Sequence, residues 1–206
     1  FFSKWYQDMV DGKLDATSFP QMAPTPHKDF GFASGLSDCG VFVPYLVYLT
    51  YGVIWLAGRF YSDMQSNLQH YAATAINYIG QSGSYSDWLA VDGSTPGNLV
   101  STAFYARCAS DMTELAQALN KPADAAAYRQ LFTNICAAFQ TNDVAADGTV
   151  GSGSQSGYFM ALYFNLLTPA QRVLAATKLV AAVQAQGGHP STGMVTPYML
   201  DRKRVM

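Results

Sequence analysis

The sequence predicts an all-α protein, and three observations lead to this prediction. Apolar residues recur at spacings of three and four along most of the 206 positions, which is the period of an amphipathic helix. No segment sustains the strict apolar–polar alternation of a β-strand. Proline stands repeatedly where such a helix would begin, as at Pro122 and in Thr168-Pro169. We therefore expect a series of helices joined by loops.

Composition limits the class of protein further. Half of the residues are hydrophobic and 13% are charged, which excludes long-range disorder. The length suits one domain with a sizeable core, so residues 1–206 are treated as a single unit. The net charge is −2 and no basic stripe is present, which argues against a nucleic-acid partner. Aromatic residues make up 14% of the chain, enough to line a pocket.

The first half of the chain contains three predicted helical segments. Residues 1–9 have the pattern of a helix body, and we expect the chain to be a piece of a longer protein. Residues 41–58 carry no charge, and this uncharged run is just long enough to span a membrane. They include Pro44 and lack a basic flank, so we interpret them as a helix buried by protein and expect no membrane partner. A third helix runs from Ser62, its expected cap, to Ile79.

The second half predicts five more helices. One begins with Pro96 at its first position, where the missing N–H costs nothing, and the next follows Pro122. Another covers residues 156–167. A capping box opening at Thr168 starts the next helix, and a last one is expected after Thr192. Counted without residues 1–9, the total is about seven helices.

The loops alternate between short, plain turns and longer segments rich in Gly, Ser, Asp and aromatic residues. The rich loops are residues 31–40, 80–95, 147–157 and 186–193. If each leads into an inner helix and each plain turn leads back, all of them lie at one end of an array of αα-hairpins. This predicts an αα-hairpin toroid, a partial (α/α)6 barrel. An incomplete barrel is expected to expose an apolar seam through which chains can self-associate.

Two carboxylates in these loops are the main candidates for a binding role. Asp87 stands beside Trp88 in a Gly- and Ser-rich loop, an arrangement suited to stacking a sugar ring and binding its hydroxyls. The alternative is that Trp88 packs the loop and Asp87 caps the following helix. Asp38 precedes the uncharged helix, where it can cap the helix, face the pocket, or do both.

Other residues carry weaker signals. Gln155 and His189 lie in rich loops, where structural roles explain most of the pattern. Asp111 and Glu114 are interpreted as solvated helix positions. The three cysteines and three histidines are too widely spaced to indicate a disulfide framework or a metal site, and no cofactor is expected. Cys108 and Cys136 are read as buried free thiols, and motifs for serine hydrolases, phosphate loops, dinucleotides and zinc hydrolases are absent.

Four segments, taken in order, resemble one known family. They are SDCGVFVPYLVYLTYG, YSDWLAVDGSTPGNLVSTAFYAR, DGTVGSGSQSGYFMALYFNLL and STGMVTPYML. The chain resembles the catalytic domain of bacterial and fungal α-L-rhamnosidases, glycoside hydrolase family 78, over nearly all of its length. The resemblance implies an (α/α)6 barrel that hydrolyses terminal α-L-rhamnose with inversion, acting on a rhamnose-containing glycoside or polysaccharide.

The resemblance also implies that the catalytic pair lies elsewhere. The family's general acid is a glutamate in an aspartate-glutamate-arginine motif, and its general base a glutamate in a tryptophan-glutamate-arginine motif. This sequence has neither motif, and Glu114 is its single glutamate. The acid is expected before Phe1 and the base beyond Met206, so the chain alone is expected to be inactive.

What the resemblance carries over is the substrate-binding set. The family's loop tryptophan and neighbouring aspartate match Trp88 and Asp87, and the aspartate before the inner helix matches Asp38. The chain departs from the family at Leu36, where a tryptophan is frequent, and at Val53, where an aspartate usually follows Tyr-Gly.

Two alternatives remain open at this point. One is another (α/α)6 glycosidase, trehalase-like or glucoamylase-like, and the other is a non-catalytic helical sugar-binding module. Low charge and the absence of Lys/Glu-rich helices favour an extracytoplasmic location, but the compartment is not determined.

Overall fold

The structure, a computed structural model, describes residues 2–13, 17–24, 31–81, 85–91 and 95–196. These residues form eight α-helices and no β-strand, as the periodicity predicted. In chain order the helices are α1 (Phe2–Asp11), α2 (Cys39–Tyr51), α3 (Trp55–Arg59), α4 (Tyr61–Thr74), α5 (Gly97–Ala118), α6 (Pro122–Asp143), α7 (Gln155–Tyr163) and α8 (Pro169–Ala185).

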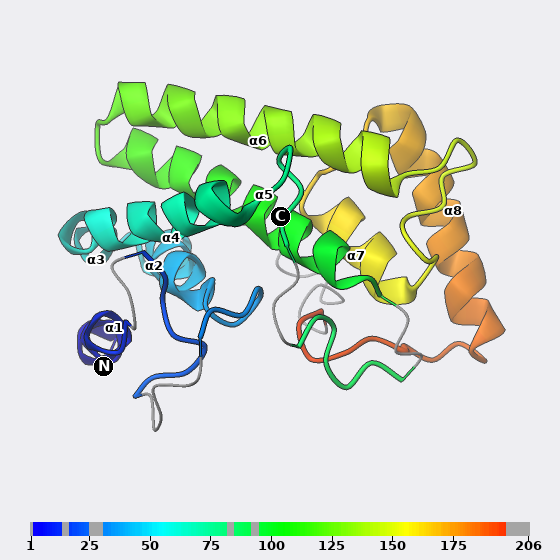
Figure 1. The fold of residues 1–206 in the computed structure, drawn as a ribbon, viewed down its shortest axis with the longest axis horizontal. Helices are drawn as coiled ribbons and strands as arrows, with labels where there is room; N and C mark the ends of the chain where they lie inside the picture. The colour runs from blue at the N-terminus through cyan, green and yellow to red at the C-terminus, as the bar shows by residue number, and fades with distance from the viewer. Residues whose placement is uncertain (1, 14–16, 25–30, 82–84, 92–94, 197–206) are drawn as a thin grey trace.

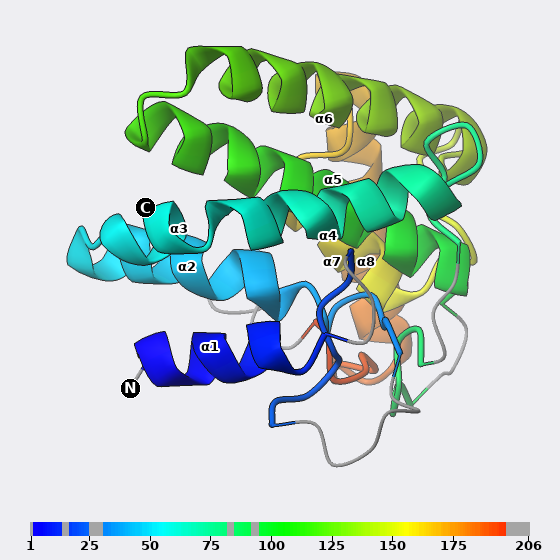
Figure 2. The ribbon, with the colours of Figure 1, turned by 60° about the vertical axis from the view of Figure 1, so that its left-hand side comes forward.

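The helices form hairpins with one inner and one outer member. Helix α5 lies at the centre and is buried along almost its whole length, with α2 and α7 packed beside it. Its partner α6 lies outside it, and Figure 2 shows α6, α5, α4 and α2 as successive layers. Helix α8 covers α7 and is mostly exposed (Figure 1). The inner set is therefore α2, α5 and α7, as the alternation of loops predicted.

Phe104 joins the three inner helices. Its ring, on α5, is fully buried and lies 5.7 Å from the ring of Phe42 on α2. On the other side it lies 5.4 Å, edge-on, from the ring of Phe164 at the end of α7. Such aromatic contacts bury large apolar areas, and they also favour particular relative orientations of the two rings.

Helix α1 is held against the start of α2 by a close-packed contact. The hydroxyl of the buried Tyr6 donates a hydrogen bond to the carbonyl oxygen of Gly40. A Cβ atom at Gly40 would lie 2.2 Å from Cδ2 of Phe19, so a glycine is required for this ring to pack there. The residues at the N-terminus thus support the same end of α2 that carries Asp38.

The single helix predicted over residues 41–58 is two helices. Gly52 adopts the left-handed conformation (φ 67°) and donates its N–H to the carbonyl of Tyr48 at 2.8 Å, which ends α2. The chain turns and resumes as the five-residue α3. Within the described residues, none of the helices is long and apolar enough to cross a membrane.

The helix predicted from Ser62 to Ile79 is also shorter than expected. Phe60 occupies the cap position of α4 without a side-chain cap, so the capping role given to Ser62 was wrong. Helix α4 ends at residue 74, and Asn77 and Tyr78 then adopt positive φ angles of 50° and 68°. This tight turn, closed by hydrogen bonds between the backbones of Ile76 and Ile79, cannot continue a helix.

The later helices follow the prediction more closely. The capping box at Thr168 and Gln171 is present in both directions, and α6 begins at Pro122. Pro96 precedes α5 by one residue instead of opening it. Helix α7 stops at residue 163, before the predicted end. The described residues after Thr192 form turns up to residue 196, and the rest of the helix predicted there lies outside the described residues.

Asp111 is not the solvated residue that the sequence suggested. It is buried on α5, and both carboxylate oxygens lie within 2.8 Å of Nε of Arg107. The guanidinium of Arg107 lies 5.5 Å from the ring centres of Tyr45 and Phe164. Burial raises the pKa of Asp111 to about 7, and the charge of Arg107 opposes this shift. The helical periodicity led to a wrong prediction for Asp111 because α5 is enclosed by other elements on nearly all sides.

The central position of Phe104 gives a test of the inner-helix packing. Phe104→Ala should lower the free energy of unfolding by about 3–5 kcal/mol, because the ring leaves a cavity between three helices. Denaturant unfolding of the intact protein measures this value. Val173→Ala, at an exposed position on α8, should change it by less than about 0.5 kcal/mol. Equal effects of the two substitutions would contradict this account of the core.

Candidate functional site

The rich loops meet at one end of the molecule, where the inner helices begin. Ser34 donates a hydrogen bond to Ser101 at 3.0 Å, which links the loop before α2 to the first turns of α5. The hydroxyls of Thr95 and Ser154 lie 2.8 Å apart, which links the residues before α5 to the cap of α7. Figure 1 shows the loops around residues 85–91 and 190–196 side by side below α7. The prediction that these loops share one end is confirmed.

Trp88 is presented to solvent from this end. Its side chain is 49% exposed, and its ring centre lies 5.7 Å from that of Tyr85 with the planes tilted by 49°. Ser86 and Leu89 on either side have positive φ angles of 49° and 64°, which makes a tight turn on which the indole is displayed. The carbonyl of Trp88 accepts a hydrogen bond from the N–H of Met194 at 2.9 Å. The backbone is thus held while the ring stays open to a ligand.

Asp87, in contrast, is 7% exposed, and its two carboxylate oxygens differ. Oδ2 accepts a hydrogen bond from the hydroxyl of Thr95 at 3.3 Å. Oδ1 is buried and has no hydrogen-bond partner among the described residues. A buried carboxylate oxygen without a donor is costly, so this position calls for a donor from outside the described residues.

Two further residues, which the sequence analysis missed, hold Asp87 in place. Ser154 accepts the N–H of Gly157 at 3.2 Å as the cap of α7, so the contact between Thr95 and Ser154 ties Asp87 to that helix. Gly193 lies directly against the loop: a Cβ there would stand 2.4 Å from Oδ1 of Asp87 and 2.5 Å from the carbonyl oxygen of Trp88. Sequence spacing gives no signal for a contact between residues about a hundred positions apart.

Asp38 lies at the same end but is fully buried. Its Oδ2 accepts hydrogen bonds from the N–H of Gly35 at 2.8 Å and the hydroxyl of Tyr71 at 2.9 Å. Its Oδ1 accepts from Nδ2 of Asn67 at 3.1 Å and Sγ of Cys108 at 3.3 Å. Burial raises the pKa of Asp38, and these hydrogen bonds oppose the shift.

This geometry corrects the capping role considered for Asp38. The residue occupies the cap position of α2 with helical backbone angles, and its side chain makes no cap hydrogen bond. None of its four hydrogen bonds goes to Asp87 or Trp88. Asp38 instead holds the loop before α2, and Gly35 of that loop packs against Val195, next to the residue bonded to Trp88. A direct role in binding stays a prediction for Asp38, as for Asp87 and Trp88.

The weaker candidates have structural partners. Gln155 is buried, and its Nε2 donates to the carbonyl oxygens of Ala182 and His189 at 3.3 and 3.2 Å. Its Oε1 accepts the N–H of Ser191 at 3.0 Å, so Gln155 fastens the loop after α8 to the start of α7. The side chain of His189 is exposed.

The cysteines are free thiols, and the described residues contain no cluster of metal ligands. Cys108 and Cys136 are buried free thiols, as predicted, and Cys39 is free and half-buried. Burial raises the pKa of Cys39 to about 11 and that of Cys136 to about 12, so both stay protonated at neutral pH. No group of three His, Cys, Asp or Glu side chains that could hold a metal ion occurs among the described residues.

The hydroxyl of Tyr71 tests the buried cluster around Asp38. Tyr71→Phe should destabilise the protein by about 1–3 kcal/mol, because one donor to a buried carboxylate is lost while the ring keeps its packing on Tyr105. Denaturant unfolding measures the change. Tyr51→Phe, whose ring is 66% exposed, is the matched control and should change stability by less than about 0.5 kcal/mol. If Tyr71→Phe left the free energy of unfolding unchanged, the cluster would not depend on this hydrogen bond.

Gly193 tests the support of the Asp87 loop. Gly193→Ala should displace this loop, because its Cβ would lie within 2.6 Å of two backbone carbonyl oxygens as well as the Asp87 carboxylate. Increased proteolysis of the intact protein near residues 85–91 and changed Trp88 fluorescence would report the displacement. Gly31→Ala, where a Cβ meets nothing within 4 Å, is the control. Unchanged signals for Gly193→Ala would refute the close contact.

The chain is similar in sequence to curated α-L-rhamnosidases. It is 35% identical over 201 residues to the α-L-rhamnosidase of Streptomyces avermitilis. It is 26% identical over 209 residues to the α-L-rhamnosidase of Formosa agariphila. These alignments cover 97% of this chain but 19% and 22% of the two enzymes, so the chain spans about a fifth of their length.

Solved structures show the same fold. The Streptomyces avermitilis α-L-rhamnosidase complexed with L-rhamnose superposes with a TM-score of 0.92 at 34% identity, over 97% of this chain and 19% of that one. The α-L-rhamnosidase of Aspergillus terreus superposes with a TM-score of 0.86 at 23% identity, over 97% of this chain and 25% of that one. The helices described above are therefore part of an (α/α)6 barrel. The model of the family described as the bacterial alpha-L-rhamnosidase 6 hairpin glycosidase domain matches residues 1–202, and the chain belongs to this family.

Proposed function

We propose that this chain is one stretch of the (α/α)6 domain of an inverting α-L-rhamnosidase and forms a wall of its sugar pocket. The observation that carries the proposal is the pairing of a half-exposed Trp88 with the buried, unpartnered Oδ1 of Asp87. A sugar ring stacked on the indole would place its hydroxyls next to the Asp87 loop, and one of them would supply the missing donor once Gly193, which covers Oδ1, moves aside. Family membership supports rhamnose as that sugar, in a terminal α-linkage.

The loops around Trp88 and Asp87 would position the sugar and would not transfer protons. Inverting hydrolysis needs two carboxyl groups roughly 6.5–9.5 Å apart, one as general acid and one as general base on water. Glu114 is exposed and lies 17 residues along α5 from Gly97, or roughly 25 Å at the rise of an α-helix. It cannot reach the end where the loops meet. We therefore assign the acid and the base to parts of the enzyme outside these 206 residues.

Asp38 would contribute to sugar binding indirectly, without touching the sugar. Its carboxylate holds the loop before α2, and that loop contacts the residues that support Trp88. We propose that Asp38 and its donors keep the pocket wall in a single arrangement, which favours binding because less freedom is lost when the sugar binds.

One edge of the partial barrel is apolar and open. Leu46, Leu49 and Tyr51 on α2 are 43–66% exposed, and Trp55 on α3 is 55% exposed. We propose that the remaining hairpins cover this surface in the intact enzyme. A chain cut to these 206 residues would self-associate through it, because exposed apolar patches of this kind favour association.

Substitution of Trp88 and Asp87 in the intact enzyme tests the proposal. Trp88→Ala and Asp87→Asn should each lower kcat/KM for p-nitrophenyl α-L-rhamnoside by about tenfold or more, since a stacking surface or a charged acceptor is lost. Trp88→Phe keeps an aromatic face and should recover part of the loss. Equilibrium binding of L-rhamnose should weaken in parallel.

Glu114→Gln provides the matched control. It should leave kcat/KM within about twofold, since this exposed glutamate takes no part in the proposed reaction. A collapse of activity in Glu114→Gln, or unchanged activity in both pocket variants, would refute the assignment of the pocket wall. Binding of rhamnose with no hydrolysis by the intact protein would instead indicate a sugar-binding module.

A further inference from the structure

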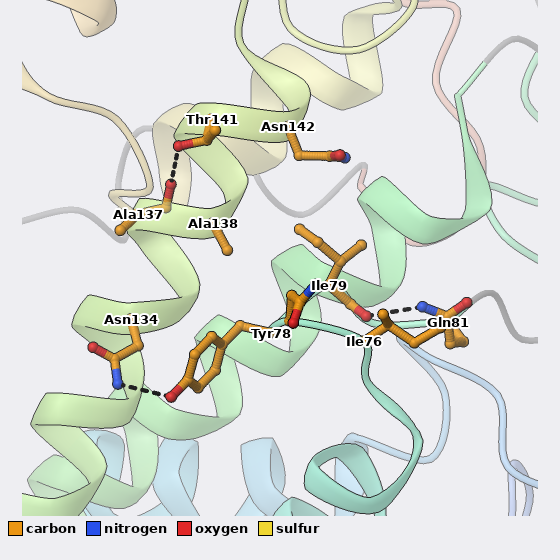
Figure 3. Close-up of a pocket in the computed structure, with 10 residues that line it drawn as sticks. Ile76, Tyr78, Ile79, Gln81, Asn134, Ala137, Ala138, Thr141 and Asn142 are labelled. Atoms are coloured by element: carbon orange, nitrogen blue, oxygen red, sulfur yellow. Dashed lines mark hydrogen bonds between the residues drawn. The ribbon is translucent and has the colours of Figure 1, made fainter.

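A second concave surface lies between the α4–α5 connection and α6. Residues 76–79 and Gln81 form one wall, and the face of α6 between Asn134 and Asn142 forms the other (Figure 3). Its volume is about 780 Å³, within the range of roughly 300–1,000 Å³ that is usual for small-molecule sites. Apart from Gln81, near the start of the loop of residues 80–95, none of its residues belongs to the loops that carry Asp87 and Trp88.

The turn that forms the first wall is rigid. The backbones of Ile76 and Ile79 exchange two hydrogen bonds of 3.0 and 2.9 Å across Asn77 and Tyr78. Gly80, just beyond, donates its N–H to the hydroxyl of Thr102 on α5 and packs so tightly on that helix that no Cβ would fit. Positive φ angles at a non-glycine pair persist where the surroundings hold them, and here they fix the direction of the Tyr78 ring.

The second wall is a row of small and amide side chains on one face of α6. Ala137 and Ala138 leave room above the helix, and Asn134 and Asn142 flank them at spacings of three and four residues. Nδ2 of Asn134 donates to the hydroxyl of Tyr78 at 3.2 Å across the groove, as Figure 3 shows. Its Oδ1 accepts from Gln130 at 2.9 Å, so this amide is held in a fixed orientation.

The chemistry of the lining favours one class of ligand. The ten residues that line the groove include four amides, a phenol and a hydroxyl, and none of them is charged. Amides and hydroxyls both donate and accept hydrogen bonds, as the hydroxyls of a sugar do. Tyr78 and Ile76, 44% and 62% exposed, offer an aromatic face and an apolar contact for the C–H face of a ring. Phosphates and carboxylates would find no cation among these lining residues.

We propose that this groove binds a neutral pyranose unit of a saccharide, with its ring against Tyr78 and its hydroxyls on Asn134 and Asn142. The groove is open and its hydrogen bonds compete with water, so the affinity for a single unit is in the millimolar range, on the order of 1 mM or weaker. The inference does not depend on the proposed rhamnosidase activity, because it uses no residue of the pocket wall.

The methyl groups of Ala137 and Ala138 are direct reporters of the groove. The intact protein, labelled with ¹³C in alanine methyl groups, is titrated with methyl α-L-rhamnopyranoside, methyl α-D-glucopyranoside and methyl β-D-galactopyranoside, and with D-galacturonate as an anionic probe. Both methyl signals should shift in a saturable way with at least one neutral glycoside, and galacturonate should bind more weakly. Tyr78→Ala should weaken this binding by about tenfold, whereas Tyr78→Phe should retain most of it.

Thr133→Ala is the control on α6, since this exposed residue does not line the groove and should leave the titration unchanged. Alanine signals away from the groove report that each variant is folded. The proposal is overturned if no neutral glycoside shifts the two methyl signals. It is also overturned if Tyr78→Ala, with a folded spectrum, binds as the wild-type protein does, or if galacturonate binds more tightly than every neutral probe.

Discussion

The carboxylate of Asp38 is the interaction on which the architecture of the loop-bearing end depends. It is removed from water, and its four donors come from the loop before α2, from α4 and from α5. Removing one partner from such a cluster leaves a buried polar atom without its hydrogen bond, so the elements that provide the donors must keep their relative positions. The donor Tyr71 also stacks on Tyr105 at 4.7 Å, and Phe104 beside it contacts α2 and α7. The polar cluster thus fixes α4 and α5 against the start of α2, and the ring contacts of Phe104 join α7 to α2 and α5.

Asp38 and Asp87, the two aspartates that the sequence suggested for substrate binding, therefore have different surroundings in the structure. Asp38 is saturated with donors inside the protein, whereas Asp87 keeps one oxygen buried and unpartnered among the described residues, next to a tryptophan that faces solvent. The first pattern is that of a residue that positions others, and the second is the observation on which the proposed sugar contact of Asp87 rests. The family match also excludes one of the two alternatives left open by the sequence, another (α/α)6 glycosidase of the trehalase-like or glucoamylase-like kind.

The order of the helices and their common end could be predicted from the sequence, because helical periodicity and the alternation of loop types are local signals. For Trp88 the sequence left a sugar-stacking role and a loop-packing role open, and the structure shows a half-exposed side chain. Gly52 was a visible break in the uncharged segment, but the run of apolar residues around it outweighed the signal. Asp111 was interpreted as a solvated helix position, and only tertiary packing shows that α5 is enclosed. The contacts of Thr95, Gly193 and Tyr71 join residues far apart in the chain, for which one sequence holds no pattern.

The contact of Gly193 with Asp87 and Trp88 has a consequence for how the protein folds. It closes a loop of about a hundred residues, and contacts of that sequence separation form late because the entropy of loop closure must be overcome first. The hairpin of α5 and α6 is local and can form early, before the end of the chain has left the ribosome. The wall that carries Trp88 cannot be completed until Gly193 has been synthesised and docked. The order of synthesis thus places the assembly of this wall after that of the hairpin of α5 and α6.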